Sequence, residues 1–359
     1  MTRALRAFLA CAALCAGPGA GSGTLQSAEE ASASERWQVM GTFATLSVPS
    51  KDREKLGACV AAAREVFSDI DRVLSNYKED SEISRLNRAS GKEALELSRQ
   101  CRQALELSLK YARMTSGAFD PTVLPLCRLW GFSGGARPSK IPDKSSIDAA
   151  LRLVGTSHLS LSDGKAKLEI AGMGLDLGGI GKGYAVDAAF QKVSELGAKD
   201  FLMNLGGNIR CRGLAEGTRP WIVGVRNPFA ADDLVGTLEL AGDVAVATSG
   251  NYEQFVLLEG ERYTHIIDPR TGYPVKGMAG VTIVSATAVE ADALSTALFV
   301  LGPQEGSKVL ASFPQSHALF VPDGKPVQIL VTPGFQKFFK PRPAFARSVT
   351  VLDQGPRPE

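Results

Sequence analysis

A glycine-rich segment between a predicted strand and a predicted helix constrains this sequence most. It carries six glycines from Gly172 to Gly183. An apolar strand at 167–171 precedes it, and a helix is expected from Gly181 to a stop before Gly197. Glycine adopts positive φ and leaves backbone N–H groups open, so main chain can approach a ligand closely. The helix N-terminus adds unpaired donors and partial positive charge, which favour phosphate.

Lys182 would add a full positive charge to this loop, which matches neither of two familiar phosphate-binding patterns. A Walker A loop needs a glycine six residues before the lysine and Ser or Thr after it, but Asp176 and Gly183 stand there. The dinucleotide pattern G-x-G-x-x-G lacks its third glycine. For the loop alone, a glycine-rich turn with a solvated lysine remains the alternative interpretation.

Composition indicates an ordinary globular protein. The chain has 359 residues, 44% of them hydrophobic, and a formal net charge of +2. This is enough for one large core or two modest ones. Lys and Arg are scattered and aromatics are few, so nothing indicates a nucleic-acid groove and no nucleic-acid partner is expected.

Residues 1–23 have the pattern of an export signal. A basic start is followed by an apolar run at 7–16 and then by small residues. The run is too short to span a membrane, which takes roughly 20 apolar residues. We therefore expect export to the periplasm. Cys11 and Cys15 raise the question of a lipid anchor, but neither has a good lipobox before it, so anchoring to the inner membrane stays open.

The remainder divides into a linker at 24–35, one catalytic domain at 36–335 and an extended tail at 336–359. The linker is rich in Gly, Ser, Ala and Glu. Four cysteines follow the signal, and their spacing matches no zinc pattern and does not reveal any disulfide pairing. They are Cys59, Cys101, Cys127 and Cys211.

Periodicity and capping residues predict helices early and late, with a strand-rich middle. Such an order favours an α+β fold with largely antiparallel sheets and flanking helices. The predicted helices are 52–74, 81–87, 98–111, 145–154, 181–196, 289–301 and 304–313. The predicted strands are 37–48, 158–161, 167–171, 201–204, 209–212, 221–226, 235–240, 244–248, 254–258, 263–268, 279–285, 318–321 and 327–331.

One acidic residue lies in an otherwise apolar helix near the end of the chain. Thr287 and Glu290 form a capping-box pattern, so the helix should begin at about Ala288. The residues at 291–301 are apolar nearly all round, which predicts burial. Asp292 is the only charge among them, and a buried carboxylate needs a cation, hydrogen-bond donors or a proton.

Hydroxyl groups beside Asp292 suggest a metal. Thr296 follows four residues later on the same helix face, and Ser295 is its neighbour. A carboxylate with hydroxyl oxygens suits Mg²⁺, which takes one or two protein carboxylates beside phosphates and water. The alternative is an aspartate that is hydrogen-bonded to a neighbouring loop.

His265 is the candidate general base. It ends a predicted strand and enters a turn, where catalytic side chains are common. Next to a phosphate loop and a metal site, an imidazole suits proton transfer near neutral pH. A purely structural role is the alternative, and it is the interpretation given to His158 and His317.

Taken together, these segments resemble the ApbE family of FAD:protein FMN transferases over roughly residues 37–330. Each motif is weak alone, but they occur in order. The resemblance lies in Met-Gly-Thr at 40–42, Ser-Asn-Tyr at 75–77, Ser-Glu-Ile-Ser at 81–84, Gly-Ala-Phe-Asp-Pro at 117–121, the loop at 176–183, Asn-Leu-Gly-Gly-Asn at 204–208, Thr-Ser-Gly at 248–250, His-Ile-Ile-Asp-Pro at 265–269 and the helix at 291–296.

The resemblance implies an exported Mg²⁺-dependent enzyme, often a lipoprotein, that splits FAD and releases AMP. The FMN half would pass to a Thr or Ser hydroxyl of an acceptor protein. Expected acceptors are exported subunits of membrane redox complexes that carry a short flavinylation motif.

By the same resemblance, Asp292 and Thr296 would bind the metal together with a backbone oxygen of Gly179. We add Ser295 as a candidate ligand, and we take His265 and Asp292 as the catalytic residues. The residues expected to line the FAD site are Met40, Tyr77, Ala118, Phe119, Asp120, Asp176, Lys182 and Ile266.

Two other functions compete. A Mg²⁺-dependent FAD pyrophosphatase would use the same pocket with water in place of the acceptor hydroxyl. An exported protein that only binds FAD would hold it without turnover. Reduction of bound FAD by a flavin oxidoreductase is the least favoured alternative.

Overall fold

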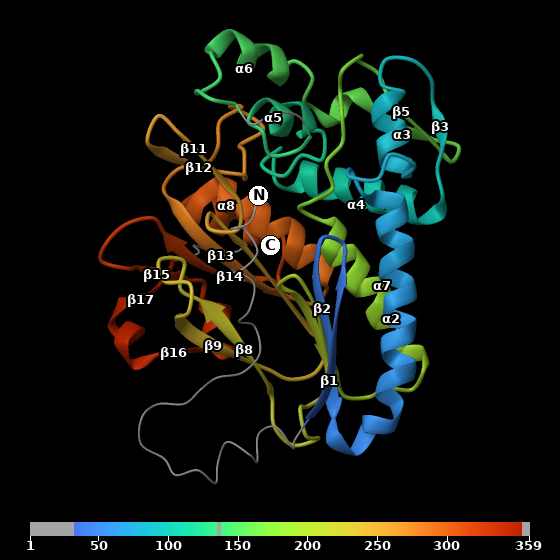
Figure 1. Cartoon of the computed structure of the whole chain (residues 1–359). Coiled ribbons are helices and arrows are strands. Elements are labelled where there is room, and N and C mark those ends of the chain that lie inside the picture. The colour runs from blue at the N-terminus through green and yellow to red at the C-terminus, as the bar shows by residue number, and fades with distance from the viewer. Residues whose placement is uncertain (1–31, 135–137, 354–359) are drawn as a thin grey trace.

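A nine-stranded sheet organises the fold in the computed structural model, which describes residues 32–134 and 138–353 (Figure 1). Neighbouring strands are antiparallel except β15 and β17, which are parallel. The prediction of an α+β fold with largely antiparallel sheets is confirmed. The strands in spatial order are β1 (Ser32–Val39), β2 (Thr42–Pro49), β6 (Phe201–Leu205), β7 (Asn208–Arg212), β10 (Val244–Gly250), β13 (Met278–Ser285), β14 (His317–Pro322), β15 (Ile329–Val331) and β17 (Val349–Val351).

Smaller sheets surround this one. The first has the order β16 (Phe339–Pro341), β9 (Leu234–Leu240) and β8 (Trp221–Arg226). The second has the order β3 (Leu95–Glu96), β5 (Lys165–Leu168) and β4 (Leu159–Ser162). The third is a hairpin of β11 (Phe255–Leu258) and β12 (Glu261–Thr264).

The helices agree well with the sequence pattern. Ser81 and Ser98 cap two of them as predicted, by accepting hydrogen bonds from the backbone N–H groups of Ser84 and Cys101. The α-helices are α2 (Arg53–Leu74), α3 (Glu82–Arg88), α4 (Arg99–Met114), α5 (Leu124–Leu129), α6 (Lys144–Leu151), α7 (Gly181–Glu195) and α8 (Ala288–Leu310). Short 3₁₀ turns are η1 (Ser50–Asp52), η2 (Thr156–His158), η3 (Pro333–Lys337) and η4 (Pro343–Ser348).

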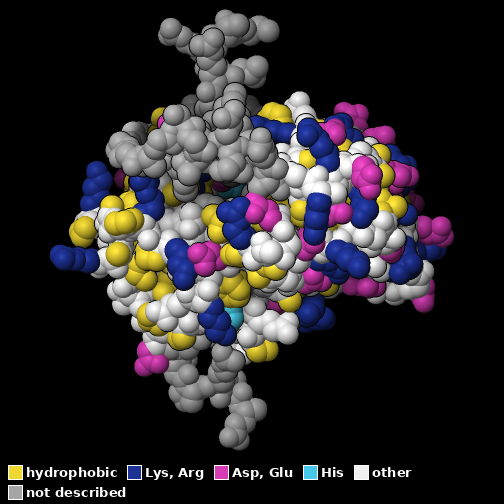
Figure 2. All heavy atoms as spheres, turned by 90° about the horizontal axis from the view of Figure 1, so that it is seen from below, with side chains coloured by type: hydrophobic (Ala, Val, Ile, Leu, Met, Phe, Trp, Pro, Cys, Tyr) yellow, Lys and Arg dark blue, Asp and Glu magenta, His cyan; other side chains and the backbone are white. Residues whose placement is uncertain are grey.

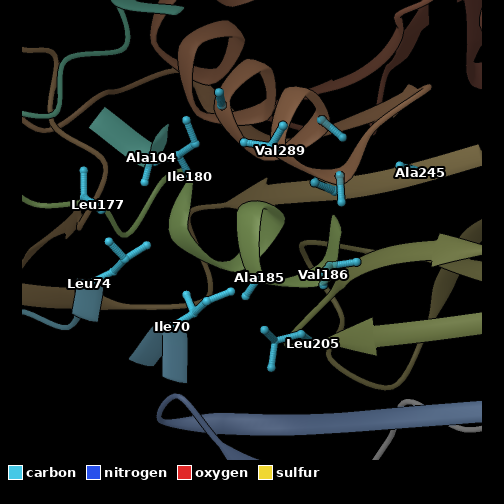
Figure 3. Close-up of a cluster of buried hydrophobic side chains, with 14 of the residues drawn as sticks. Ile70, Leu74, Ala104, Leu177, Ile180, Ala185, Val186, Leu205, Ala245 and Val289 are labelled. Carbon is cyan, nitrogen blue, oxygen red and sulfur yellow. The ribbon is translucent and has the colours of Figure 1, made fainter. Parts of the chain in front are cut away.

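Both faces of the main sheet are covered. Helices α2, α7 and α8 pack on one face, and the sheet of β8, β9 and β16 packs on the other. On β10, Ala245 and Ala247 therefore enter one core while Val246 enters the other. Figure 3 shows part of the first core, where Ile70 of α2 and Val186 of α7 lie among other apolar side chains.

Three element predictions were wrong. The residues at 37–48 form two strands, because Met40 and Gly41 take positive φ values of 50° and 68° and reverse the chain in a hairpin turn. The predicted strand at 167–171 ends earlier, at Leu168. The strand predicted at 263–268 ends at Thr264. The prediction of two helices at 289–301 and 304–313 is confirmed, because α8 consists of two helical segments that meet at a kink at Gly302, where φ is 72°.

The predicted domain ends also differ from the structure. Strand β1 begins at Ser32, inside the segment taken as a linker. The segment taken as an extended tail contains β16, which pairs with β9, and β17, which pairs with β15. Backbone pairing thus gives regular structure to a segment that was predicted, from its prolines, to be an extended tail. The export signal with Cys11 and Cys15 lies outside the described residues.

Three further features bear on the sequence predictions. The four cysteines after the signal are all buried as free thiols. None of the helices in the described part of the chain combines the length and apolar character needed to cross a bilayer. On the face shown in Figure 2, basic and acidic side chains are interspersed rather than gathered by sign.

Candidate active site

The N-termini of α7 and α8 meet, and each helix supplies a carboxylate to the other. The backbone N–H of Gly183 in α7 donates to Asp292 Oδ2 at 2.8 Å. In return, the two carboxylate oxygens of Asp187 accept hydrogen bonds from the N–H groups of Ala288 and Val289, both at 2.9 Å. A helix N-terminus favours negative charge and leaves donors unpaired. Asp292 therefore lies at the positive end of the helix that follows the glycine-rich loop.

Gly183 makes this contact sterically feasible. A Cβ atom at this position would lie 2.3 Å from the carbonyl oxygen of Ala288 and 2.7 Å from Cβ of Asp292. Any larger residue would push α7 and α8 apart. The last glycine of the loop thus serves the packing of two helices, a role that the sequence pattern did not suggest.

We expect Gly183→Ala to destabilise the fold by about 1–3 kcal/mol, because the added methyl group overpacks the contact between α7 and α8. Urea unfolding would measure the loss. The matched control is Gly57→Ala within α2, where a Cβ meets no atom within 4 Å. This control should stabilise the protein by about 0.5–1 kcal/mol through helix propensity. Equal effects of the two substitutions would contradict the packing argument.

Asp292 is buried as predicted, with 5% of its surface exposed. Burial raises the pKa of its carboxyl group, while the charge of Lys182, the N–H of Gly183 and the side chain of Asn208 lower it. The alternative of an aspartate that is hydrogen-bonded to a neighbouring segment is thus partly realised. A carboxylate has about four acceptor positions, so these contacts leave capacity for a cation.

The oxygen atoms near Asp292 fit a small divalent cation. A Cβ on Gly179 would lie 3.0 Å from Thr296 Oγ1, so the backbone of the loop runs directly against that hydroxyl. Oδ1 of Asn208 is buried without a hydrogen-bond partner. Carboxylate, hydroxyl and carbonyl oxygens are the ligands that Mg²⁺ prefers. The described residues contain no group of three or more His, Cys, Asp or Glu side chains suited to a metal, so this site would rely on one carboxylate.

Ser295 has other contacts. Its hydroxyl donates to the carbonyl oxygen of Asp292 at 2.9 Å and lies 2.8 Å from Ser249 Oγ on β10. Ser249 Oγ also lies 3.4 Å from Thr296 Oγ1. The Ser295 hydroxyl therefore links α8 to β10 of the sheet. Of the two hydroxyl groups, that of Thr296 is better placed to bind a cation near Gly179.

The positive charge of Lys182 acts on several of the predicted site residues. Its ammonium group donates to the carbonyl oxygen of Gly178 at 3.0 Å. Burial raises the pKa values of Asp176 and Asp292, and the positive charge of Lys182 opposes this rise. For His265, burial lowers the pKa and the charge of Lys182 lowers it further. These residues come from the glycine-rich loop, the segment after β12 and helix α8, so the fold gathers distant parts of the chain around one lysine.

His265 follows β12 directly, as predicted for a residue that enters a turn. Its Nδ1 lies 3.1 Å from the carbonyl oxygen of Gln254. Because a carbonyl only accepts, Nδ1 carries the proton in the neutral ring and Nε2 is left as an acceptor. Burial lowers the pKa of His265 to about 4, and the charge of Lys182 acts in the same direction. The imidazole is therefore neutral at pH 7.

Asp176 and Tyr77 form the next part of the site. Asp176 Oδ1 accepts from the N–H of Gly178 at 2.8 Å. Burial raises the pKa of Asp176, opposed by that N–H, the Asn76 side chain and Lys182. Burial around its hydroxyl and the charge of Asp176 raise the pKa of Tyr77, although 77% of the residue is exposed. An exposed aromatic ring thus lies near a half-buried acid.

The other predicted FAD-site residues are mainly buried or engaged within the protein. Asp120 Oδ1 accepts from both the N–H and the hydroxyl of Thr122, at 2.7 and 2.6 Å. Phe119 has a ring carbon 3.3 Å from the Cβ position of Gly179, which places it next to the loop. Ala118 and Ile266 are buried, and Met40 lies in the turn between β1 and β2.

Three residues that shape this site have no role in the sequence-based predictions. Asn208 contacts Asp292, Ser249 contacts Thr296, and Asp187 caps α8. The first two lie in motifs noted for the family resemblance, so their position was a usable signal. Asp187 offered none, because its partner is the backbone of a helix about a hundred residues away.

Comparison with known proteins identifies the family. A sequence model described as the ApbE family matches residues 40–320. The chain belongs to the ApbE family. The family prediction is therefore confirmed.

Relatives within the ApbE family match most of the chain. A protein named FAD:protein FMN transferase from Klebsiella pneumoniae (strain 342) is 32% identical over 306 residues, covering 84% of this chain and 87% of the relative. One of the same name from Vibrio cholerae is 33% identical over 258 residues, covering 70% and 77%. These names confirm the prediction that the chain is a transferase.

Solved ApbE structures share the fold. The ApbE protein of Thermotoga maritima superposes with a TM-score of 0.78 at 33% identity, covering 86% of this chain and 99% of its own. The flavin transferase ApbE of Vibrio cholerae superposes with a TM-score of 0.76 at 29% identity, with the same coverage.

Proposed function

We propose that this chain is a Mg²⁺-dependent FAD:protein FMN transferase that attaches FMN to a Thr or Ser hydroxyl of an exported acceptor and releases AMP. The observation that carries the proposal is the position of Lys182, whose charge acts on Asp176, His265 and Asp292 together. A diphosphate needs such a cation, and a hydroxyl nucleophile needs a neutral base nearby. The names of the curated relatives support the same reaction.

The reaction would be a displacement at phosphorus. The acceptor hydroxyl oxygen attacks the phosphorus of the FMN half, and a new P–O bond forms as the diphosphate bond breaks. AMP leaves with the bridging oxygen, and Nε2 of His265 takes the hydroxyl proton. Such a transfer depends on alignment and on neutralising phosphate oxygens rather than on covalent chemistry by the protein.

The residues of this site can supply both the alignment and the neutralisation of charge. Lys182 and the N-terminus of α7 would hold the diphosphate. Asp292, Thr296 and the backbone oxygen of Gly179 would hold Mg²⁺. When bound, the ion would offset charge on the phosphate oxygens. Tyr77 presents an exposed ring beside Asp176, and such a ring can stack on one of the flat ring systems of FAD.

Hydrolysis of FAD is the competing reaction, since water could take the place of the acceptor hydroxyl in the same site. We expect the purified chain with FAD and Mg²⁺ alone to release little AMP. Addition of an acceptor should start release, with one AMP formed for each FMN attached. Free FMN and AMP that accumulate rapidly without acceptor would instead indicate a pyrophosphatase, and tight FAD binding with no product under either condition would indicate a storage protein.

The acceptor is proposed to be an exported subunit of a membrane redox complex with a Ser/Thr flavinylation motif. The signal pattern at 1–23 supports action in the periplasm, where Cys11 or Cys15 would carry the lipid anchor. Mass spectrometry of a co-expressed candidate acceptor should show the added mass of FMN on one hydroxyl residue. Mass spectrometry of the mature N-terminus would establish cleavage and lipidation.

A further inference from the structure

Asn208 is a buried polar residue that begins β7, directly after a tight turn. Gly206 and Gly207 have φ values of 58° and 93°, and the side chain of Asn204 accepts a hydrogen bond from the N–H of Gly207 at 2.9 Å. This turn joins β6 to β7 and leaves Asn208 only 4% exposed. Its side chain is therefore held in the protein interior by the backbone of a hairpin.

The two ends of this amide have different surroundings. The Asn208 side chain hydrogen-bonds to the carboxylate of Asp292, and a carboxylate only accepts, so the NH₂ group must face it. Oδ1 is consequently directed elsewhere, and it is buried without a hydrogen-bond partner within the protein. Unsatisfied buried acceptors are rare in folded proteins, and a water or an ion commonly supplies the missing partner.

We propose that Asn208 is a positioning residue for the divalent ion, with its NH₂ group orienting Asp292 and its Oδ1 accepting a hydrogen bond from a water of the ion's hydration shell. Mg²⁺ usually keeps several waters when it binds to protein. Residues that hold a ligand without touching the metal are a normal part of such sites. The inference rests on the proposed Mg²⁺ dependence and gives a role to a residue that the predicted ligand set did not contain.

Asn208 is better suited to this task than its neighbours. Asn204 lies in the same hairpin turn, but its side chain is used by the N–H of Gly207. Asn76 also has a buried Oδ1 without a hydrogen-bond partner, but its side chain acts on Asp176 rather than on Asp292. Of these three asparagines, only Asn208 has both a buried Oδ1 without a hydrogen-bond partner and a hydrogen bond to Asp292.

The test is a direct measurement of ion binding without FAD. We expect Asn208→Ala to weaken the binding of Mg²⁺ by about 10–100-fold in isothermal titration calorimetry, the usual effect of removing such a residue. Asn204→Ala is the matched control, because it disturbs the same turn and leaves the Asn208 amide intact, and its affinity should match that of the wild type. Unchanged affinity in Asn208→Ala, or equal losses in the two variants, would overturn the proposal.

A second variant keeps the shape of the side chain. Asn208→Asp places a second carboxylate beside Asp292, which destabilises the ion-free protein through like-charge repulsion. A nearby cation relieves that repulsion. Mg²⁺ should therefore raise the melting temperature of this variant more than that of the wild type. An equal or smaller rise would show that no ion binds next to residue 208.

These measurements separate the inference from the proposed function. If Asp292→Ala binds Mg²⁺ as tightly as the wild type, the ion site itself is misplaced and both proposals fail. If Asp292→Ala loses the ion while Asn208→Ala keeps it, the transferase proposal stands and the role of Asn208 is refuted.

Discussion

The Asp292→Ala variant should transfer flavin at least about 10³-fold more slowly than the wild type. Asp292 is the only carboxylate in the proposed ligand set, so its loss should remove the ion and several kcal/mol of charge stabilisation at the phosphate oxygens. Each 1.36 kcal/mol of barrier corresponds to a factor of ten in rate. The rate of FMN attachment to an acceptor, followed by in-gel flavin fluorescence, measures the loss.

Two controls make the result specific. Asp292→Asn keeps the shape of the side chain and an acceptor oxygen for the N–H of Gly183, but it lacks the charge, so it should be nearly as inactive as Asp292→Ala while it folds normally. Asp69→Ala removes an acid of α2 that forms a surface ion pair with Arg72, away from the proposed ligand set, and its activity should be unchanged. Near-normal labelling by Asp292→Asn would show that charge at this position does not matter.

Local rules predicted the elements that build the site. Apolar spacing and flanking residues predicted α7 and α8, and the burial of Asp292 followed from a helix that is apolar nearly all round. The position of His265 after a strand was also correct. These features depend on residues within a few positions of one another, where the sequence carries a strong signal.

The remaining features depend on contacts across the chain. The pairing of Asp187 with the N-terminus of α8, and of Gly183 with Asp292, joins positions about a hundred residues apart. The order in the C-terminal segment comes from pairing of β16 with β9, which no local pattern indicates. The hairpin turn at Met40 was missed because methionine rarely takes positive φ. These hydrogen bonds, this strand pairing and this turn depend on tertiary contacts, which local sequence patterns do not reveal.

The His265→Ala variant should slow transfer by about 10²–10⁴-fold, the range for loss of a general base, and FAD should still bind. The imidazole is neutral at pH 7 and its Nε2 is left as an acceptor, so its removal takes away the group that receives the acceptor proton. Stopped-flow labelling would measure the rate, and quenching of FAD fluorescence would measure binding. His158→Ala is the control, because this half-buried residue of η2 is not part of the proposed site, and its rate should not change.

The pH dependence of kcat/KM tests the same assignment through the protonation state of the free enzyme. Burial lowers the pKa of His265 to about 4, so the neutral form persists above that pH and is lost below it. The rate should therefore be level near neutral pH and should fall as the pH drops through about 4. Because the charge of Lys182 also lowers this pKa, Lys182→Met should move the acid limb to higher pH. An acid limb that persists unchanged in His265→Ala would assign it to another group and leave His265 without a role as the base.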